Sequence, residues 1–207
     1  MSFRTEDKYI IYDHTQDIIH YLLGNGGKFL FPARKIISIY FDNENLEMFY
    51  DSEEGVVPRK KVRIRYYNNQ NENSLGLCKI DKKNLKFETK INSAEGKFKI
   101  EKNLKNNKLD ELKKCFYDDQ YELLKPVLIT EYKRYYLSFK NSRATVDSDI
   151  KYYNAKNPKI FKRDERKIFE MKSNKLYNLD IDTISIPKTR FSKYCEGCKY
   201  IFNLCPT

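Results

Sequence analysis

The clearest hydrophobic pattern along the chain is an alternation of apolar and polar residues. Side chains two positions apart on a strand share one face, so this alternation is typical of β-strands. Runs rich in β-branched and aromatic residues strengthen the same expectation. The pattern predicts strands over residues 3–12, 35–42, 60–67, 85–91, 127–139, 142–152 and 166–172, with a short extended piece over 46–51.

Helical spacing of apolar residues is confined to three segments. Asp13 precedes a stripe of isoleucines and leucines that Gly24 ends, which predicts a capped helix over 13–23. A second helix is predicted over 109–124 and a third from Ser192 onward. The length of 207 residues fits a single domain spanning 1–207. We therefore expect an α+β fold, namely a closed antiparallel β-barrel with a few flanking helices.

Charged residues occupy alternate positions in six of the predicted strands. Arg63 and Arg65 share one face of their strand, and Glu88 shares a face with Lys90. The same spacing joins Glu6 with Lys8, Tyr132 with Arg134, Arg143 with Asp147, and Glu170 with Lys172. An antiparallel sheet with one wet face also shows this alternation, so a solvated face remains the alternative for each strand taken alone.

In a closed barrel, one face of every strand lines an interior. Charges there would cost several kcal/mol each without partners. Arginine binds phosphate oxygens in bidentate fashion, and glutamate can hold Mg²⁺ or Mn²⁺. The pattern therefore favours an interior for a metal-bound triphosphate. The side chains expected to point inward are Arg63, Arg65, Glu88, Lys90, Arg134, Arg143, Glu170 and Lys172.

The charged motifs, taken in order, resemble those of the VTC domain, the polyphosphate polymerase branch of the CYTH-like triphosphate tunnel proteins. No single motif is specific for this family, but the combination of seven motifs in the same order along one chain is specific for it. The matching segments are Arg4–Tyr9, Ser38–Asp42, Lys61–Tyr66, Phe87–Lys90, Tyr132–Tyr135 with Arg143–Asp147, Phe169–Lys172, and Arg190–Tyr194.

The resemblance implies a tunnel that transfers the γ-phosphate of ATP, or of another nucleoside triphosphate, to a growing polyphosphate with the help of Mn²⁺ or Mg²⁺. The catalytic phosphate contacts it implies are Lys8, Arg63, Arg65, Lys90, Arg134, Lys172 and Lys193. The candidate substrate-binding residues are Tyr132, Arg143, Arg190 and Ser192, and the candidate metal ligands are Glu170, Glu6 and Glu88. One further basic position could be filled by either Lys97 or Lys99.

Two other functions stay open at this point. Tunnel enzymes that hydrolyse triphosphates open with two glutamates and a lysine, whereas Arg4 stands in the first of those positions and favours the polymerase branch. A module that only binds polyphosphate or another polyanion is the second alternative. The carboxylates of Glu88 and Glu170 argue against it, because they would repel an anion unless a metal were present.

The overall charge agrees with a phosphate-rich partner. The chain carries 40 Lys and Arg against 29 Asp and Glu, a net charge of +11, which favours anions such as ATP and polyphosphate. We expect no nucleic acid partner, because adjacent tyrosines such as Tyr66 and Tyr67 point to opposite faces of a strand and cannot form one stacking platform.

The location is expected to be cytoplasmic, because no stretch approaches the ~20 apolar residues of a membrane span and the N-terminus carries acids where a signal peptide is apolar. A peripheral membrane partner stays open. Five cysteines without a signal peptide make a disulfide framework unexpected. Cys195 and Cys198 have the spacing of a zinc motif with Cys205 as a third ligand, but buried cysteines on a terminal helix are the simpler reading.

Overall fold

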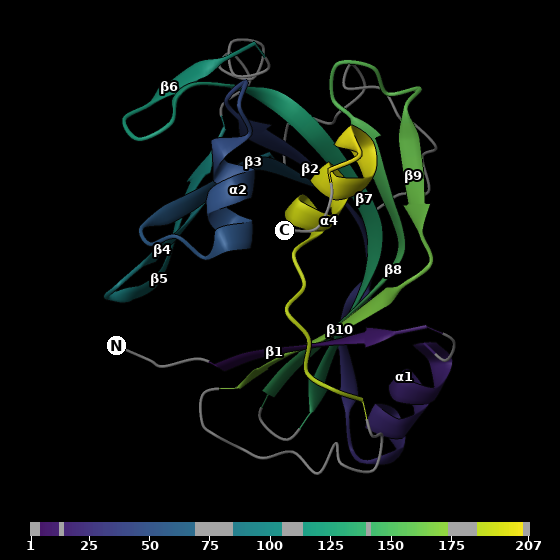
Figure 1. Ribbon diagram of the computed structural model, residues 1–207. Coiled ribbons are helices and arrows are strands. Elements are labelled where there is room, and N and C mark those ends of the chain that lie inside the picture. Colours follow the sequence, from purple (N-terminus) through teal and green to yellow (C-terminus); the bar gives the residue numbers. More distant parts are fainter. Residues whose placement is uncertain are drawn as a thin grey trace. The chain divides into compact units, whose positions relative to one another are not determined.

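The computed structural model describes residues 5–12, 15–68, 85–104, 114–139, 142–173 and 186–204. Within them, ten strands join one sheet in the order β1-β10-β8-β7-β2-β3-β4-β5, with β6 paired to β7 and β9 to β8 (Figure 1). The strands are β1 (Thr5–Ile11), β2 (Lys28–Asp42), β3 (Arg59–Asn68), β4 (Lys86–Ser93), β5 (Gly96–Asn103), β6 (Phe116–Asp118), β7 (Glu122–Phe139), β8 (Ser142–Asn154), β9 (Phe161–Asp164) and β10 (Lys167–Ser173). The helices are α1 (Thr15–Gly24), α2 (Glu47–Glu54) and α4 (Lys193–Phe202).

The sheet is not closed, so the prediction of a barrel is wrong. Over the described residues its path ends at β1 and β5, and these two strands do not pair with each other. The outer edge of β1 is covered by the segment near Lys188, which forms a bridge with Tyr9, while the Thr189 N–H donates to the Lys8 carbonyl at 2.8 Å. The strand β5 is exposed along nearly its whole length and carries lysines, a common way to blunt a free edge.

The chain divides into two compact units, each assembled from three separate segments. Unit 1 comprises Met1–Lys35, Tyr132–Ile150 and Arg163–Phe191, and unit 2 comprises Ile36–Glu131, Lys151–Lys162 and Ser192–Thr207. The long strands β2, β7 and β8 contribute residues to both units. The single-domain prediction stays a prediction.

The core of unit 1 lies between α1 and one face of the sheet. Ile18 and Leu22 of α1 pack with apolar side chains that alternate along the neighbouring strands, including Tyr9, Val146 and Phe169. The polar residues between these positions therefore lie on the opposite face of β1, β8 and β10. This face carries the charged rows that the sequence predicted.

In unit 2, the buried carboxylate of Asp42 holds two helices in place. It accepts hydrogen bonds from the backbone N–H groups of Met48 and Phe49, both at 3.1 Å, at the start of α2. It also accepts one from the hydroxyl of Tyr194 in α4. Burial raises the pKa of Asp42 to about 6, and these hydrogen bonds oppose that rise. Asp42 thus replaces the missing side-chain cap of α2.

Two elements differ from their predictions. Residues 47–54 form α2 and not an extended piece, because the Asp42 carboxylate satisfies its first N–H groups. The helix predicted over 109–124 is wrong from Phe116 onward, where β6 and β7 pair instead. Asp118 makes the turn between them, since its carboxylate accepts from the N–H groups of Gln120 and Tyr121. Residues 109–113 of that helix lie outside the described residues.

Several predictions are confirmed. The strands expected near 3–12, 35–42, 60–67, 85–91, 127–139, 142–152 and 166–172 appear as β1, β2, β3, β4, β7, β8 and β10. The last helix begins after Ser192, whose hydroxyl accepts from the Cys195 N–H. The strands β5 and β9 were not predicted. In the part of the chain that the structure describes, no helix has the length and apolar character needed to traverse a lipid bilayer.

A glycine in unit 1 tests the packing between α1 and the sheet. A Cβ atom at Gly27 would lie 2.5 Å from the carbonyl oxygen of Leu22 and 3.3 Å from that of Ser138, both backbone atoms. We expect Gly27→Ala to lower the free energy of unfolding by about 1–3 kcal/mol, measured by urea denaturation. Gly24→Ala is the matched control, since no atom lies within 4 Å of its added Cβ and the change should stay within about 0.5 kcal/mol. Equal stability of the two variants would contradict this packing.

Candidate functional site

In unit 2, a buried carboxylate on β4 holds two arginines of β3. The register places Arg63 opposite Glu88. Arg63 donates from Nε to Glu88 Oε2 at 2.7 Å and from Nη2 to the same oxygen at 2.6 Å, while Arg65 Nη1 lies 3.7 Å away. Arg63 and Arg65 keep only 7% and 8% of their surface exposed, and Glu88 keeps none. The predicted pair of arginines therefore shares one buried anion.

The ionised form of Glu88 is strongly favoured. Burial raises its pKa, but the charges of Arg63 and Arg65 and the hydrogen bond from Lys99 outweigh that effect, and the pKa falls to about 2. Lys99 Nζ donates to Glu88 Oε1 at 2.8 Å. Of the two lysines left open by the sequence, Lys99 is thus the one that contacts this cluster.

Strand β2 supports the same arginines from the other side. Arg63 Nη1 donates to the Tyr40 hydroxyl at 2.9 Å, and Arg65 Nε donates to Ser38 Oγ at 3.3 Å. Burial raises the pKa of Tyr40, but Arg63 and Arg65 outweigh it, so the pKa lies below its ordinary value. The guanidinium groups are therefore oriented by three strands before any ligand binds. Neither Ser38 nor Tyr40 was a candidate site residue, although both stand at alternate positions within the matching segment of β2.

A row of lysines crosses the same face of the sheet. The register sets Lys61, Lys90 and Lys99 side by side on β3, β4 and β5. Lys61 Nζ donates to Ser192 Oγ at 2.9 Å and to Cys195 Sγ at 3.4 Å, and so contacts the N-terminus of α4. The start of a helix favours anions, and here Lys61 lies beside it. Lys61 was missed as a candidate, although its spacing of two from Arg63 already placed it on this face.

In unit 1, a second cluster lies on the polar face of β1 and β10. The register pairs Lys8 with Glu170 and Glu6 with Lys172. Lys172 Nζ lies 3.0 Å from Glu170 Oε1 and 3.2 Å from Glu6 Oε2. Lys8 Nζ lies 3.2 Å from Glu6 Oε1 and donates to the carbonyl of Phe191 at 3.0 Å. Two carboxylates thus share one lysine.

The electrostatics of Glu170 resemble those of Glu88. Burial raises the pKa of Glu170, but the charges of Arg134, Lys172 and Lys8 outweigh it and hold the pKa well below its ordinary value. Burial lowers the pKa of Lys172, and Glu170 and Glu6 reverse that effect. Both partners are therefore charged.

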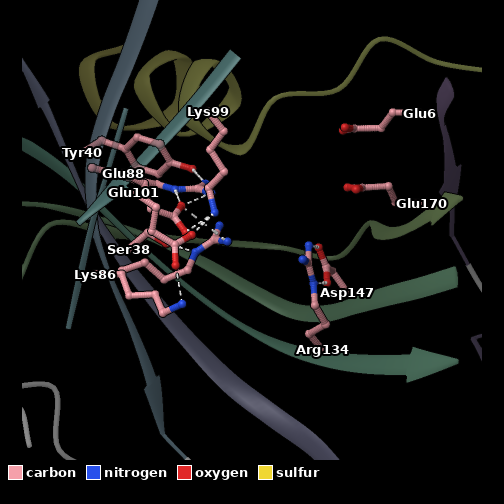
Figure 2. Close-up of polar contacts among 12 residues, drawn as sticks. Glu6, Ser38, Tyr40, Lys86, Glu88, Lys99, Glu101, Arg134, Asp147 and Glu170 are labelled. Carbon is pink, nitrogen blue, oxygen red and sulfur yellow. Dashed lines mark hydrogen bonds and ion pairs between the residues drawn. The ribbon is translucent and has the colours of Figure 1, made fainter. Parts of the chain in front are cut away.

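Arg134 is held by a buried aspartate in the same unit. It donates from Nε and Nη2 to the two oxygens of Asp147 at 2.5 and 2.6 Å (Figure 2). Its guanidinium lies 5.3 Å from the ring centre of Tyr132, which is itself buried. Bidentate pairing fixes the plane of the guanidinium.

The remaining candidates are more exposed. Lys90, Arg143 and Arg190 are exposed, and Ser192 and Lys193 are half-buried. Arg4, the first residue of the matching segment Arg4–Tyr9, and Cys205 lie outside the described residues. Cys195 and Cys198 are free, buried thiols on α4. The phosphate contacts predicted for Lys90 and Lys193, and the substrate binding predicted for Arg143, Arg190 and Ser192, stay predictions.

The fit of a divalent metal depends on two carboxylates. Over the described ranges, no three His, Cys, Asp or Glu side chains gather as a ready-made metal site. Mg²⁺ usually takes only one or two carboxylates and completes its shell with substrate phosphates. Glu6 and Glu170 lie around one cation, the Lys172 ammonium, at 3.2 and 3.0 Å, so a metal held by both would have to displace that ammonium. Glu88 is already engaged by Arg63, Arg65 and Lys99, so its role as a metal ligand stays a prediction.

Comparison with known proteins identifies the class. The VTC domain family matches residues 3–202, so the chain belongs to that family. No curated protein matches the sequence significantly. Family membership supports phosphoryl chemistry of the triphosphate tunnel kind, carried out by an enzyme.

Solved structures agree with this fold. A candidate adenylate cyclase from Bacillus halodurans is similar with a TM-score of 0.57 at 13% identity, over 93% of this chain and 96% of that one. A candidate adenylate cyclase from Vibrio parahaemolyticus is similar with a TM-score of 0.55 at 10% identity, over 96% of this chain and 98% of that one. At such low identity the likeness shows the fold alone.

The buried arginine cluster makes stability depend on Glu88. We expect Glu88→Gln to lower the free energy of unfolding by about 3–5 kcal/mol at neutral pH, because it leaves Arg63 and Arg65 without their shared anion. Glu101→Gln is the control, since Glu101 pairs with Lys86 and Lys99 near the surface and should cost less than about 1 kcal/mol.

The difference in the free energy of unfolding between wild type and Glu88→Gln should also depend on pH. A carboxyl whose pKa is depressed by folding contributes stability above its unfolded value near 4.5, and that contribution is lost as the pH falls through about 2. The gap between wild type and Glu88→Gln should therefore narrow with acidification, measured by denaturant unfolding between pH 7 and 2. A gap that stays constant over this range would show that Glu88 is not the stabilising anion.

Proposed function

We propose that this protein synthesises polyphosphate, by transferring the γ-phosphoryl group of ATP or another nucleoside triphosphate to the end of a polyphosphate chain. One observation carries the proposal: the buried carboxylate Glu88 is surrounded by the three cations of Arg63, Arg65 and Lys99. A polyanion would neutralise the remaining positive charge. The family to which the chain belongs supports the same class of chemistry.

The residues would act mainly by position and charge. Phosphoryl transfer needs little covalent work from a protein, and most of the catalysis comes from alignment and from stabilising charge on the transferred group. Arg63, Arg65 and Arg134 are held rigidly by carboxylates and are suited to bind phosphate oxygens in bidentate fashion. Lys8 and Lys172 add point charges beside Glu170.

In the proposed reaction, a terminal oxygen of the acceptor chain forms a bond to the γ-phosphorus of the donor. The bond from that phosphorus to the β–γ bridging oxygen breaks, and ADP leaves when ATP is the donor. Glu6 and Glu170 would hold Mn²⁺ or Mg²⁺, which when bound would neutralise charge on the phosphate oxygens. Tyr132 would add a hydroxyl contact beside Arg134.

The products distinguish synthesis from hydrolysis. With ATP and Mn²⁺, the purified protein should release ADP without a matching amount of orthophosphate, and polyphosphate should accumulate on a gel. In hydrolysis, water would attack the γ-phosphorus instead of the acceptor chain. Orthophosphate equal to ADP at every time point, without chains, would support a triphosphate hydrolase and overturn the proposed synthesis. Binding of polyphosphate without turnover would support a binding module.

Replacement of Glu170 tests whether this carboxylate holds the metal. Glu170→Gln should destabilise the unliganded protein by about 3–5 kcal/mol, because Lys172, Arg134 and Lys8 lose their common anion. Tripolyphosphate, added without metal, should raise the melting temperature of this variant at least as much as that of wild type, since it replaces the missing charge. Turnover with Mn²⁺ should fall by orders of magnitude.

The matched control is Glu165→Gln, which removes an exposed carboxylate that pairs with Arg163. It should change neither stability nor turnover appreciably. Near-normal turnover of Glu170→Gln with Mn²⁺ would show that Glu170 does not hold the metal.

A further inference from the structure

An aromatic cluster with two arginines lies on the polar face of unit 1. The rings of Phe31 and Tyr136 meet edge to face, with centres 5.8 Å apart and planes at 87°. The guanidinium carbon of Arg34 lies 4.9 Å from the ring centre of Phe31 and 5.8 Å from that of Tyr136. Arg143 lies 5.3 Å from the ring centre of Tyr136. The two guanidinium groups and the two rings therefore contact one another as a single cluster.

The cluster has a buried base and an exposed top. Tyr136 keeps only 3% of its surface exposed, whereas Phe31 keeps 46% and Phe29, two residues earlier on the same strand, keeps 52%. Arg143 is also exposed. Contiguous exposed apolar surface marks interaction sites on soluble proteins, and two exposed aromatic rings stand two residues apart on this strand. Because Tyr136 and Arg34 fix the ring of Phe31, little rotational freedom would be lost when a ligand stacks on it.

The strand register connects this cluster to the proposed phosphate site. Arg143 lies opposite Lys172, and Lys172 contacts Glu170 and Glu6. Arg143 in turn lies over Tyr136, which contacts Phe31. The path from the proposed metal site to Phe31 thus runs through neighbouring groups, all within unit 1. It passes first through cations and ends on an aromatic ring.

A nucleoside triphosphate has groups that match this order, because its phosphates are charged at one end and its base is flat and aromatic at the other. We propose that Phe31 is the stacking platform for the nucleobase of the phosphoryl donor, and that Arg143 binds the phosphate next to the nucleoside. This inference rests on the proposed function and assigns its donor subsite. An apolar peptide has no anionic group to pair with the two flanking arginines, so the charge pattern favours a nucleotide.

The test compares two ligands that differ only by the nucleoside end. ATP and tripolyphosphate are titrated calorimetrically in metal-free buffer, where no metal-dependent turnover occurs. In Phe31→Ala, the Kd for ATP should rise roughly tenfold or more, the range found when one stacking aromatic is removed from a nucleobase. The Kd for tripolyphosphate should change less than about twofold, since phosphate affinity comes from the cations. Phe31→Leu keeps the apolar bulk without the aromatic face and should show the same selective loss.

The control is Phe161→Ala, which removes another exposed aromatic that stacks on Tyr153 in unit 2 and should change neither Kd. Unchanged ATP affinity in both Phe31 variants would overturn the platform and assign the exposed rings to an apolar partner. An equal loss for ATP and tripolyphosphate would also overturn it, because Phe31 would then act through the phosphate site. If wild type binds neither ligand, the proposed function itself fails, an outcome distinct from the selective one.

Discussion

The structure depends on the burial of charged groups that neutralise one another within a β-sheet. Glu88 has no exposed surface, yet it is ionised because Arg63, Arg65 and Lys99 surround it. An unpaired buried carboxylate would destabilise the fold through its desolvation, and so would a buried arginine without a partner. The strand register removes both costs by setting Arg63 directly opposite Glu88. Such a cluster tolerates little change, since loss of one member leaves the others uncompensated.

Unit 1 repeats this device with different residues. Glu170 is held by Lys172, Lys8 and Arg134, and Asp147 holds Arg134 a second time. In both units the cations are already oriented before a ligand arrives. Preorganised charge is what phosphoryl transfer requires, because the developing charge on the transferred group is then stabilised without rearrangement. The same arrangement explains why no catalytic histidine or nucleophile is needed for the proposed reaction.

The sequence predicted the strands and their charged faces well, because period-two alternation survives in β1, β3, β4, β8 and β10. It failed where local spacing and tertiary contacts disagreed. The segment over 47–54 looks extended by composition, but the carboxylate of Asp42, six residues before Met48 at the end of β2, caps it. The closed barrel failed because closure depends on whether β5 meets β1, and the period of side chains holds no information about that contact. The stacking of Arg143 on Tyr136 was equally hidden, since it joins two strands.

The division of the chain into two units has a consequence for how this protein can vary. Each unit combines an early, a middle and a late segment, so no single cut releases either one intact. Neither could be duplicated, exchanged or expressed alone as a module. Added domains or inserted segments are therefore expected only at the two chain ends and in the connections between strands. A single crossover cannot exchange the proposed catalytic residues of one unit while leaving those of the other unchanged, because their order along the polypeptide interleaves both units.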